Sequence, residues 1–234
     1  MTTRQELARL GAVAAVIGPI VVFVTTLLHP MSADPNEPLA AFAEYAADSL
    51  WVASHLGQFI GFSILAVAFI GLAAAMEDGK PAAWGRVGLI GTAASLALAG
   101  ALQAVDGVAL RSMLLRWTQV SNGARERAFD AALAVRQIEI GLASLLSVVM
   151  GLTVVVFAIA MSVGRRFPRW LGYFGFIGGF GNVSAGLAAA YTGFSPLEMI
   201  ISMPATVLIG VWVIVIGVFL RKVAPGLSEN DGAA

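Results

Sequence analysis

Cysteine is absent from the 234-residue chain, and charged residues make up only 12% of it. The missing cysteine excludes disulfide bonds, thiolate metal sites and lipid anchors on cysteine. The low charge is about half of what a soluble domain carries, where about 25% of residues are charged. Because 59% of the residues are hydrophobic, the composition predicts a polytopic membrane protein that lies in a lipid bilayer.

A strong charge of either sign is also missing, since the formal net charge is zero and the basic residues are scattered. No basic stripe or known nucleic-acid-binding motif occurs, so we expect no nucleic-acid partner. Histidine is scarce as well, with only His29 and His55 in the whole chain.

Long apolar runs predict six spans, each near the roughly 20 residues that cross a bilayer. They cover residues 7–28, 51–76, 87–105, 138–163, 171–191 and 199–220. We therefore expect an all-α membrane bundle formed by one domain, residues 1–222. Residues 223–234 are expected to be a disordered tail.

Two polar segments between the spans carry helical patterns of their own. Residues 31–50 combine an acidic loop with an amphipathic stripe that includes Phe42 and Tyr45, which favours a helix lying on the membrane surface. Residues 107–137 continue the third and fourth spans as a helical hairpin, broken at Ser121-Asn122-Gly123. We expect these two segments to form a small extracytoplasmic helical cap.

The basic residues outside the hairpin fall on one side of a six-span topology. They are Arg4, Arg9, Lys80, Arg86, Arg165, Arg166, Arg169, Arg221 and Lys222. Because cytoplasmic loops carry an excess of Lys and Arg, this pattern predicts a multi-pass protein of the cell membrane with both termini in the cytoplasm. The five arginines of the outer hairpin argue the other way, but long folded segments weigh less in this rule.

Two short motifs flank the acidic loop. Leu28-His29-Pro30 ends the first span, and Trp51-x-x-x-His55 opens the second. With the bundle that follows, the chain resembles bacterial six-span integral membrane proteins of unknown function. The resemblance covers most of the chain and implies a fold class and a membrane location. It transfers no catalytic residue.

Unusual polar residues gather at the outer ends of the spans. Besides the two histidines, those we predict to bind a ligand are Gln58, Gln103, Asp106, Arg111, Arg136 and Glu139. Ionisable groups inside a membrane are costly unless paired or hydrated, and often mark function. We expect the site near Asp106, with Arg136 as the partner of its carboxylate. The competing interpretation is that these residues only join the helix ends to the cap.

His29 and His55 lie at similar depth on consecutive antiparallel spans, so they can meet. Two neutral imidazoles could ligate haem iron, or a metal ion with Asp106 or Glu139 as the oxygen ligand. The alternative is that each histidine bonds a backbone carbonyl at a helix end.

Our leading hypothesis is a non-enzymatic membrane protein that binds a small or lipidic ligand in a polar outer pocket. We predict no catalytic residue and no bound cofactor. One alternative is a haem- or metal-binding redox protein that uses His29 and His55, and another is a proton-coupled transporter that uses Asp106. The sequence does not indicate an oligomeric state.

Overall fold

The computed structural model describes residues 2–227, which form helices and no β-strand. The expected all-α membrane bundle is therefore confirmed. The α-helices are α1 (Thr3–Leu27), α2 (Pro38–Ala47), α3 (Trp51–Ala74), α4 (Lys80–Gln103), α5 (Arg111–Gln119), α6 (Gly123–Val163), α7 (Arg169–Thr192) and α8 (Pro196–Val223). A π-helix, η1 (Ala104–Leu110), joins α4 to α5, and a 3-10 helix, η2 (Ala224–Gly226), follows α8.

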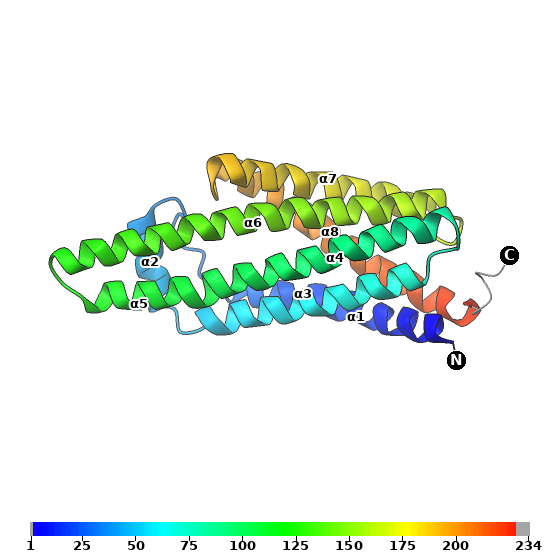
Figure 1. Cartoon of the computed structure of the whole chain (residues 1–234), viewed down its shortest axis with the longest axis horizontal. Helices are drawn as coiled ribbons and strands as arrows, with labels where there is room; N and C mark the ends of the chain where they lie inside the picture. Colours follow the sequence, from blue (N-terminus) through cyan, green and yellow to red (C-terminus); the bar gives the residue numbers. More distant parts are fainter. Residues whose placement is uncertain (1, 228–234) are drawn as a thin grey trace.

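Five helical stretches are long and apolar enough to cross a membrane: α1, α3, α4 continued through α5, α6, and α8 with η2. Helix α7 is as long as α3 and α4, with 24 residues, but its glycines and Asn182 lower its hydropathy. It nevertheless runs alongside α6 in the same bundle (Figure 1).

The six long helices pack as a closed ring. Neighbours along the chain contact each other in the order α1, α3, α4, α6, α7 and α8, and α8 returns to α1. The beginning of α1 and the end of α8 lie at one end of the bundle, the terminal end, whereas α2 and α5 lie at the other, outer end (Figure 1). At the terminal end, the Gln5 side chain donates a hydrogen bond to the Leu227 carbonyl at 2.8 Å.

The ring is filled with apolar side chains toward the terminal end. Phe69 of α3 and Phe157 of α6 stack with ring centroids 5.2 Å apart, and Trp212 of α8 lies beside Phe69. The Trp212 indole is fully buried and donates to the Leu171 carbonyl at 2.8 Å. This hydrogen bond satisfies the one polar atom of the side chain, so the buried indole leaves no unpaired donor.

Helices α6 and α7 approach closely through small residues. A Cβ added at Gly179 would lie 2.8 Å from the Gly151 carbonyl oxygen, a distance that real Cβ atoms do not reach. Asn182 donates its amide to the Ser147 carbonyl at 3.0 Å across the same contact. Small residues with an occasional interhelical hydrogen bond are the usual way for membrane helices to associate.

Helix α6 is longer than a bilayer requires. Its 41 residues span about 60 Å, whereas the hydrocarbon core is about 30 Å thick. Its first part pairs with α5 as a hairpin beyond the rest of the bundle (Figure 1). Asn122 enters the turn with φ of 54°, a left-handed value that asparagine tolerates better than most residues.

Helix α2 packs on this hairpin, which corrects the expectation that it lies on the membrane surface. Its Phe42 and Tyr45 are buried, at 1% and 4% exposure, in an apolar cap core with α5 and α6. The Phe42 ring contacts Phe129 of α6 with centroids 5.5 Å apart. The apolar stripe of α2 packs against protein. The sequence pattern is the same for a helix that packs against protein and for one that packs against lipid.

The sequence places the start of the disordered tail at residue 223, but the helical structure continues beyond that residue. Residues Ala224–Gly226 form η2, and Ala224 and Leu227 are buried against the apolar core. The physical reason is that Leu227 is apolar and its carbonyl accepts the Gln5 hydrogen bond. Residues 228–234 lie outside the described part of the chain.

Candidate metal centre at the outer end

The first turn of α3 positions His55. Its Nδ1 lies 2.6 Å from the Trp51 carbonyl oxygen, one turn earlier, and the residue is 2% exposed. Because a carbonyl only accepts, Nδ1 must carry the ring proton of the neutral imidazole. The other nitrogen, Nε2, lies 2.9 Å from Oδ2 of Asp106.

A π-helix places Asp106 opposite His55. The wider turn of η1 interrupts the long helix at this residue, and such turns are common at functional sites. The Trp51 indole donates to the Asp106 carbonyl at 3.0 Å. Gly107 permits the close approach, since a Cβ there would lie 2.6 Å from the His55 Cβ. Sequence reasoning missed the π-helix, because nothing in A-L-Q-A-V-D-G distinguishes it from an α-helix.

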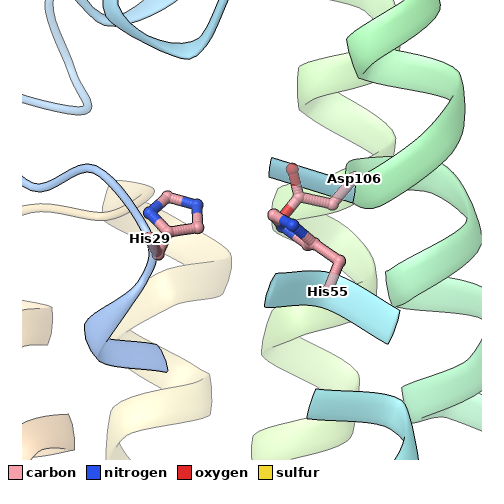
Figure 2. A group of neighbouring side chains, drawn as sticks. All are labelled: His29, His55 and Asp106. Carbon is pink, nitrogen blue, oxygen red and sulfur yellow. The ribbon is translucent and has the colours of Figure 1, made fainter. Parts of the chain in front are cut away.

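His29 completes the group from the loop after α1. Its Nδ1 lies 2.8 Å from the Pro30 carbonyl, so this nitrogen also carries the proton. Figure 2 shows one His29 ring nitrogen directed toward Asp106 and His55. The pKa of the His29 imidazole is lowered from 6.5 because burial disfavours the charged ring more than Asp106 favours it. A neutral His29 therefore presents an unprotonated Nε2.

The three side chains have the composition and spacing of a metal site. Each offers one ligand atom, and these atoms all lie within 4.8 Å of one another. Bonds of about 2.1 Å to a tetrahedral ion place ligand atoms about 3.4 Å apart. The present spacings, from 2.9 Å between His55 and Asp106 to at most 4.8 Å, would reach this value by small shifts. The Nδ1 bonds to backbone carbonyls are the outer-shell contacts that orient metal-ligating histidines.

The pair between His55 and Asp106 needs a cation. With Nδ1 protonated, Nε2 of a neutral His55 directs a lone pair at a carboxylate oxygen only 2.9 Å away. The two atoms repel unless a proton or a metal ion lies between them. The second oxygen of Asp106, Oδ1, is buried and has no hydrogen-bond partner among the described residues.

Aromatic rings enclose His29 and His55. The Trp51 ring contacts both imidazoles with centroids 4.6 Å apart, and Tyr45 lies beside Trp51 at 4.5 Å. The two imidazoles themselves are 5.2 Å apart. This packing restricts ring rotation, so both histidines are held in place before any ion arrives. The spacing does not accommodate haem between them, because a porphyrin plane and two iron–nitrogen bonds would separate the rings further.

Arg136 and Glu139 form a separate pair, which differs from the expected partnership of Arg136 with Asp106. The Arg136 guanidinium donates to Oε1 of Glu139 at 2.6 Å, one turn along α6, and both are buried. Arg136 also lies over the ring of Phe194 at 4.8 Å. Oε2 of Glu139 has no partner among the described residues, so this carboxylate keeps a buried acceptor near the histidines.

The other predicted residues occupy the same end in different roles. Gln103 donates to Gln58 at 3.1 Å, one turn below the group on α4 and α3. Arg111 donates to the carbonyl of Tyr45 and thereby ties α5 to α2. Of the six predicted ligand-binding residues, Asp106 belongs to the candidate centre and the other five lie at the same end of the bundle. Four of these five form two pairs, Gln58 with Gln103 and Arg136 with Glu139.

The fold and the site together define a helical membrane-spanning protein with a His–His–Asp group at the end opposite its termini. Comparisons with protein-family models, with curated proteins and with solved structures returned no match.

Proposed function

We propose that the protein binds a divalent transition-metal ion, with Zn²⁺ as the best fit, through His29, His55 and Asp106. The observation that carries the proposal is the convergence of three ligand atoms from three separate segments within 4.8 Å. Both histidines have their other nitrogen against a backbone carbonyl, which favours metal binding through Nε2.

The ligand types narrow the choice of ion. Two imidazoles and a carboxylate suit Zn²⁺ and Fe²⁺, whereas Mg²⁺ and Ca²⁺ prefer sets made only of oxygen. Three protein ligands leave a fourth tetrahedral position for water or another molecule, which is typical of catalytic or exchanging zinc sites.

A direct test is calorimetric titration of the purified, chelator-treated protein with Zn²⁺. We expect one ion per chain, and at least a hundred-fold weaker binding in each of His29→Ala, His55→Ala and Asp106→Asn. Glu37→Gln is the matched control, because it removes an exposed acid at the same end, outside the group. Binding that is absent in the wild type, or unchanged in His55→Ala, would show that only a proton joins His55 to Asp106.

We also infer that the protein lies in the cell membrane with its termini and basic turns in the cytoplasm, and with the metal centre outside. Support comes from the terminal end of the bundle, where Arg4 and Arg166 bind the carbonyls that end α3 and where Lys-rich and Arg-rich turns are expected. Reporter fusions after Lys80 and Arg169 should read cytoplasmic, and a fusion near Asn122 external. The reverse pattern would overturn this orientation.

A further inference from the structure

A second candidate site lies inside the ring of helices. A cavity of about 430 Å³ is bounded by α1, α3, α6, α7 and α8. Pockets that bind small molecules usually have about 300–1,000 Å³. None of the predicted polar ligand-binding residues lines this cavity, so it is distinct from the metal centre.

The walls of the cavity are almost entirely apolar. No described Asp, Glu, Lys, Arg or His lines it, and its one amide, Asn182, already donates to the Ser147 carbonyl. An apolar space of this kind does not hold water well, because water needs two to four polar partners. The occupant must therefore be largely hydrocarbon.

The exposure of the cavity-lining residues on α1 and α8 indicates an opening between these two helices. Ile20 and Phe23 of α1 and Val207 and Val211 of α8 line it and are also 45–60% exposed on the outer surface. Because these helices are membrane-spanning, that surface faces lipid. The opening connects the cavity with the hydrocarbon core of the bilayer, and not with water.

The two helices separate toward this opening. At Gly217 an added Cβ would lie 2.9 Å from the Ala15 Cβ, so the helices touch there. Two turns further out, at Gly210, the nearest atom to an added Cβ is Pro19 Cβ at 4.0 Å. Proline within α1 removes a helix hydrogen bond at this level, which allows the chain to bend away.

We propose that this cavity binds the hydrocarbon chain of a membrane lipid, which enters between α1 and α8. A helix about 10 Å wide would fill such a volume with roughly one turn, so a single extended chain fits it better. On the α1 side the cavity ends at Thr26, three residues before His29. On the α3 side it ends at Phe62, about 10 Å along the helix from His55. The chain site does not depend on a bound metal.

The test uses photolabelling in vesicles of phosphatidylethanolamine and phosphatidylglycerol. The probes are a phosphatidylglycerol and a free fatty acid, each with a diazirine near the end of its chain. The diagnostic peptide contains Leu146 and Met150 of α6, which line the cavity, Leu146 being only 7% exposed. Because the neighbouring Leu145 and Leu152 are 54% and 49% exposed and can be labelled from the surrounding lipid, the label is assigned to single residues. Labelling at Leu146 then reports a chain inside the cavity. Labelling by either probe supports the proposal and identifies the source of the chain.

Gly210→Leu should reduce this labelling at least five-fold, because the side chain extends into open space at the entrance. Gly141→Leu is the matched control: it adds the same atoms to α6 where nothing lies within 4 Å, and should label like the wild type. Val207→Phe narrows the same entrance by another route and should also reduce labelling. An unlabelled wild type, or full labelling in both entrance variants, would overturn the proposal.

The metal and lipid experiments can fail separately. Gly210→Leu should keep its bound Zn²⁺, because the metal centre lies beyond the cavity. His55→Ala should keep its label, because the cavity walls do not include His55. Loss of labelling in His55→Ala would overturn the independence of the two sites.

Discussion

At the end that holds both termini, the helices meet through apolar side chains and glycines. At the opposite end the same helices meet through histidine, carboxylate, glutamine and arginine, with several buried polar atoms that have no partner among the described residues. Buried polar groups without partners cost free energy, whereas close apolar packing stabilises. The comparison indicates that the terminal half stabilises the bundle by apolar packing, whereas the outer half contains the buried ionisable groups of the proposed site.

The largest effect should follow from breaking the packed half. Gly179→Leu inserts a large side chain where even a Cβ would lie 2.8 Å from Val155 Cγ2 and from the Gly151 carbonyl. Overpacking costs about 1–3 kcal/mol, and we expect about 3 kcal/mol or more for four added carbons against backbone. Thermal melting in detergent measures it, with Gly141→Leu as control. Equal melting temperatures would mean that α6 and α7 are not in contact.

An effect of similar size concerns the buried ion pair of the outer half. Arg136→Gln should destabilise the protein by about 3–5 kcal/mol, because it leaves the Glu139 carboxylate buried and unpaired. Adding Glu139→Gln should recover part of the loss, since the second change removes the orphan charge. A double-mutant cycle between Arg136 and Asp106 should show a smaller coupling than the cycle between Arg136 and Glu139. A larger coupling of Arg136 with Asp106 than with Glu139 would instead support the pair expected from the sequence.

A smaller effect should appear at the contact between η1 and α3. Gly107→Ala places a methyl group 2.6 Å from the His55 Cβ, so His55 must move. We expect a loss of about 1–3 kcal/mol in stability and about ten-fold weaker Zn²⁺ binding, comparable to outer-shell changes in known metal sites. Gly141→Ala is the control. Unchanged Zn²⁺ affinity would mean that the contact of η1 with α3 does not position the metal ligands.

The smallest effect should be confined to the loop before α2. Glu44 accepts hydrogen bonds from the backbone of Ser32 at 3.0 Å and Ala33 at 2.8 Å, and the Ala33 bond in particular lowers the pKa of its carboxyl below 4.5. A carboxyl whose pKa is lower in the folded state stabilises that state at pH values above its pKa in the unfolded chain. This stabilisation is lost as the pH falls through the pKa of the folded state. Hydrogen-exchange protection of residues 31–37 should therefore drop below pH 4.5. Glu44→Gln should abolish this pH dependence, and a dependence that persists would point to another group.

The fold class was predictable because membrane spans leave a strong signal in composition and run length. The six apolar runs correspond to six long helices, and only their ends differ: α4 starts at Lys80, seven residues before the predicted span. The surroundings of α2 were harder to predict, because an apolar stripe with Phe42 and Tyr45 can pack equally well against lipid or protein. That distinction depends on tertiary packing, which no local pattern reports.

The site was predictable in part. Antiparallel spans of known depth indicate that His29 and His55 can meet, and the structure brings them together. The partner of Asp106 was not predictable, because helical rotation decides it and η1 changes that rotation by inserting a wider turn. With a regular helix, the sequence favoured Arg136. The aromatic enclosure by Trp51 and Tyr45 also requires the three-dimensional arrangement, although Trp51 lies one turn from His55.

The most direct test of the central claim is X-ray absorption at the zinc edge of the Zn²⁺-loaded protein. The account predicts one ion per chain with nitrogen and oxygen ligands at about 2.0–2.2 Å, including two imidazoles. Thiolate sulfur is excluded, since the chain has no cysteine. His29→Ala and His55→Ala should each remove one imidazole from the spectrum. A bound ion without imidazole ligands, or one that both variants leave unchanged, would contradict the assignment of the outer end as a metal centre.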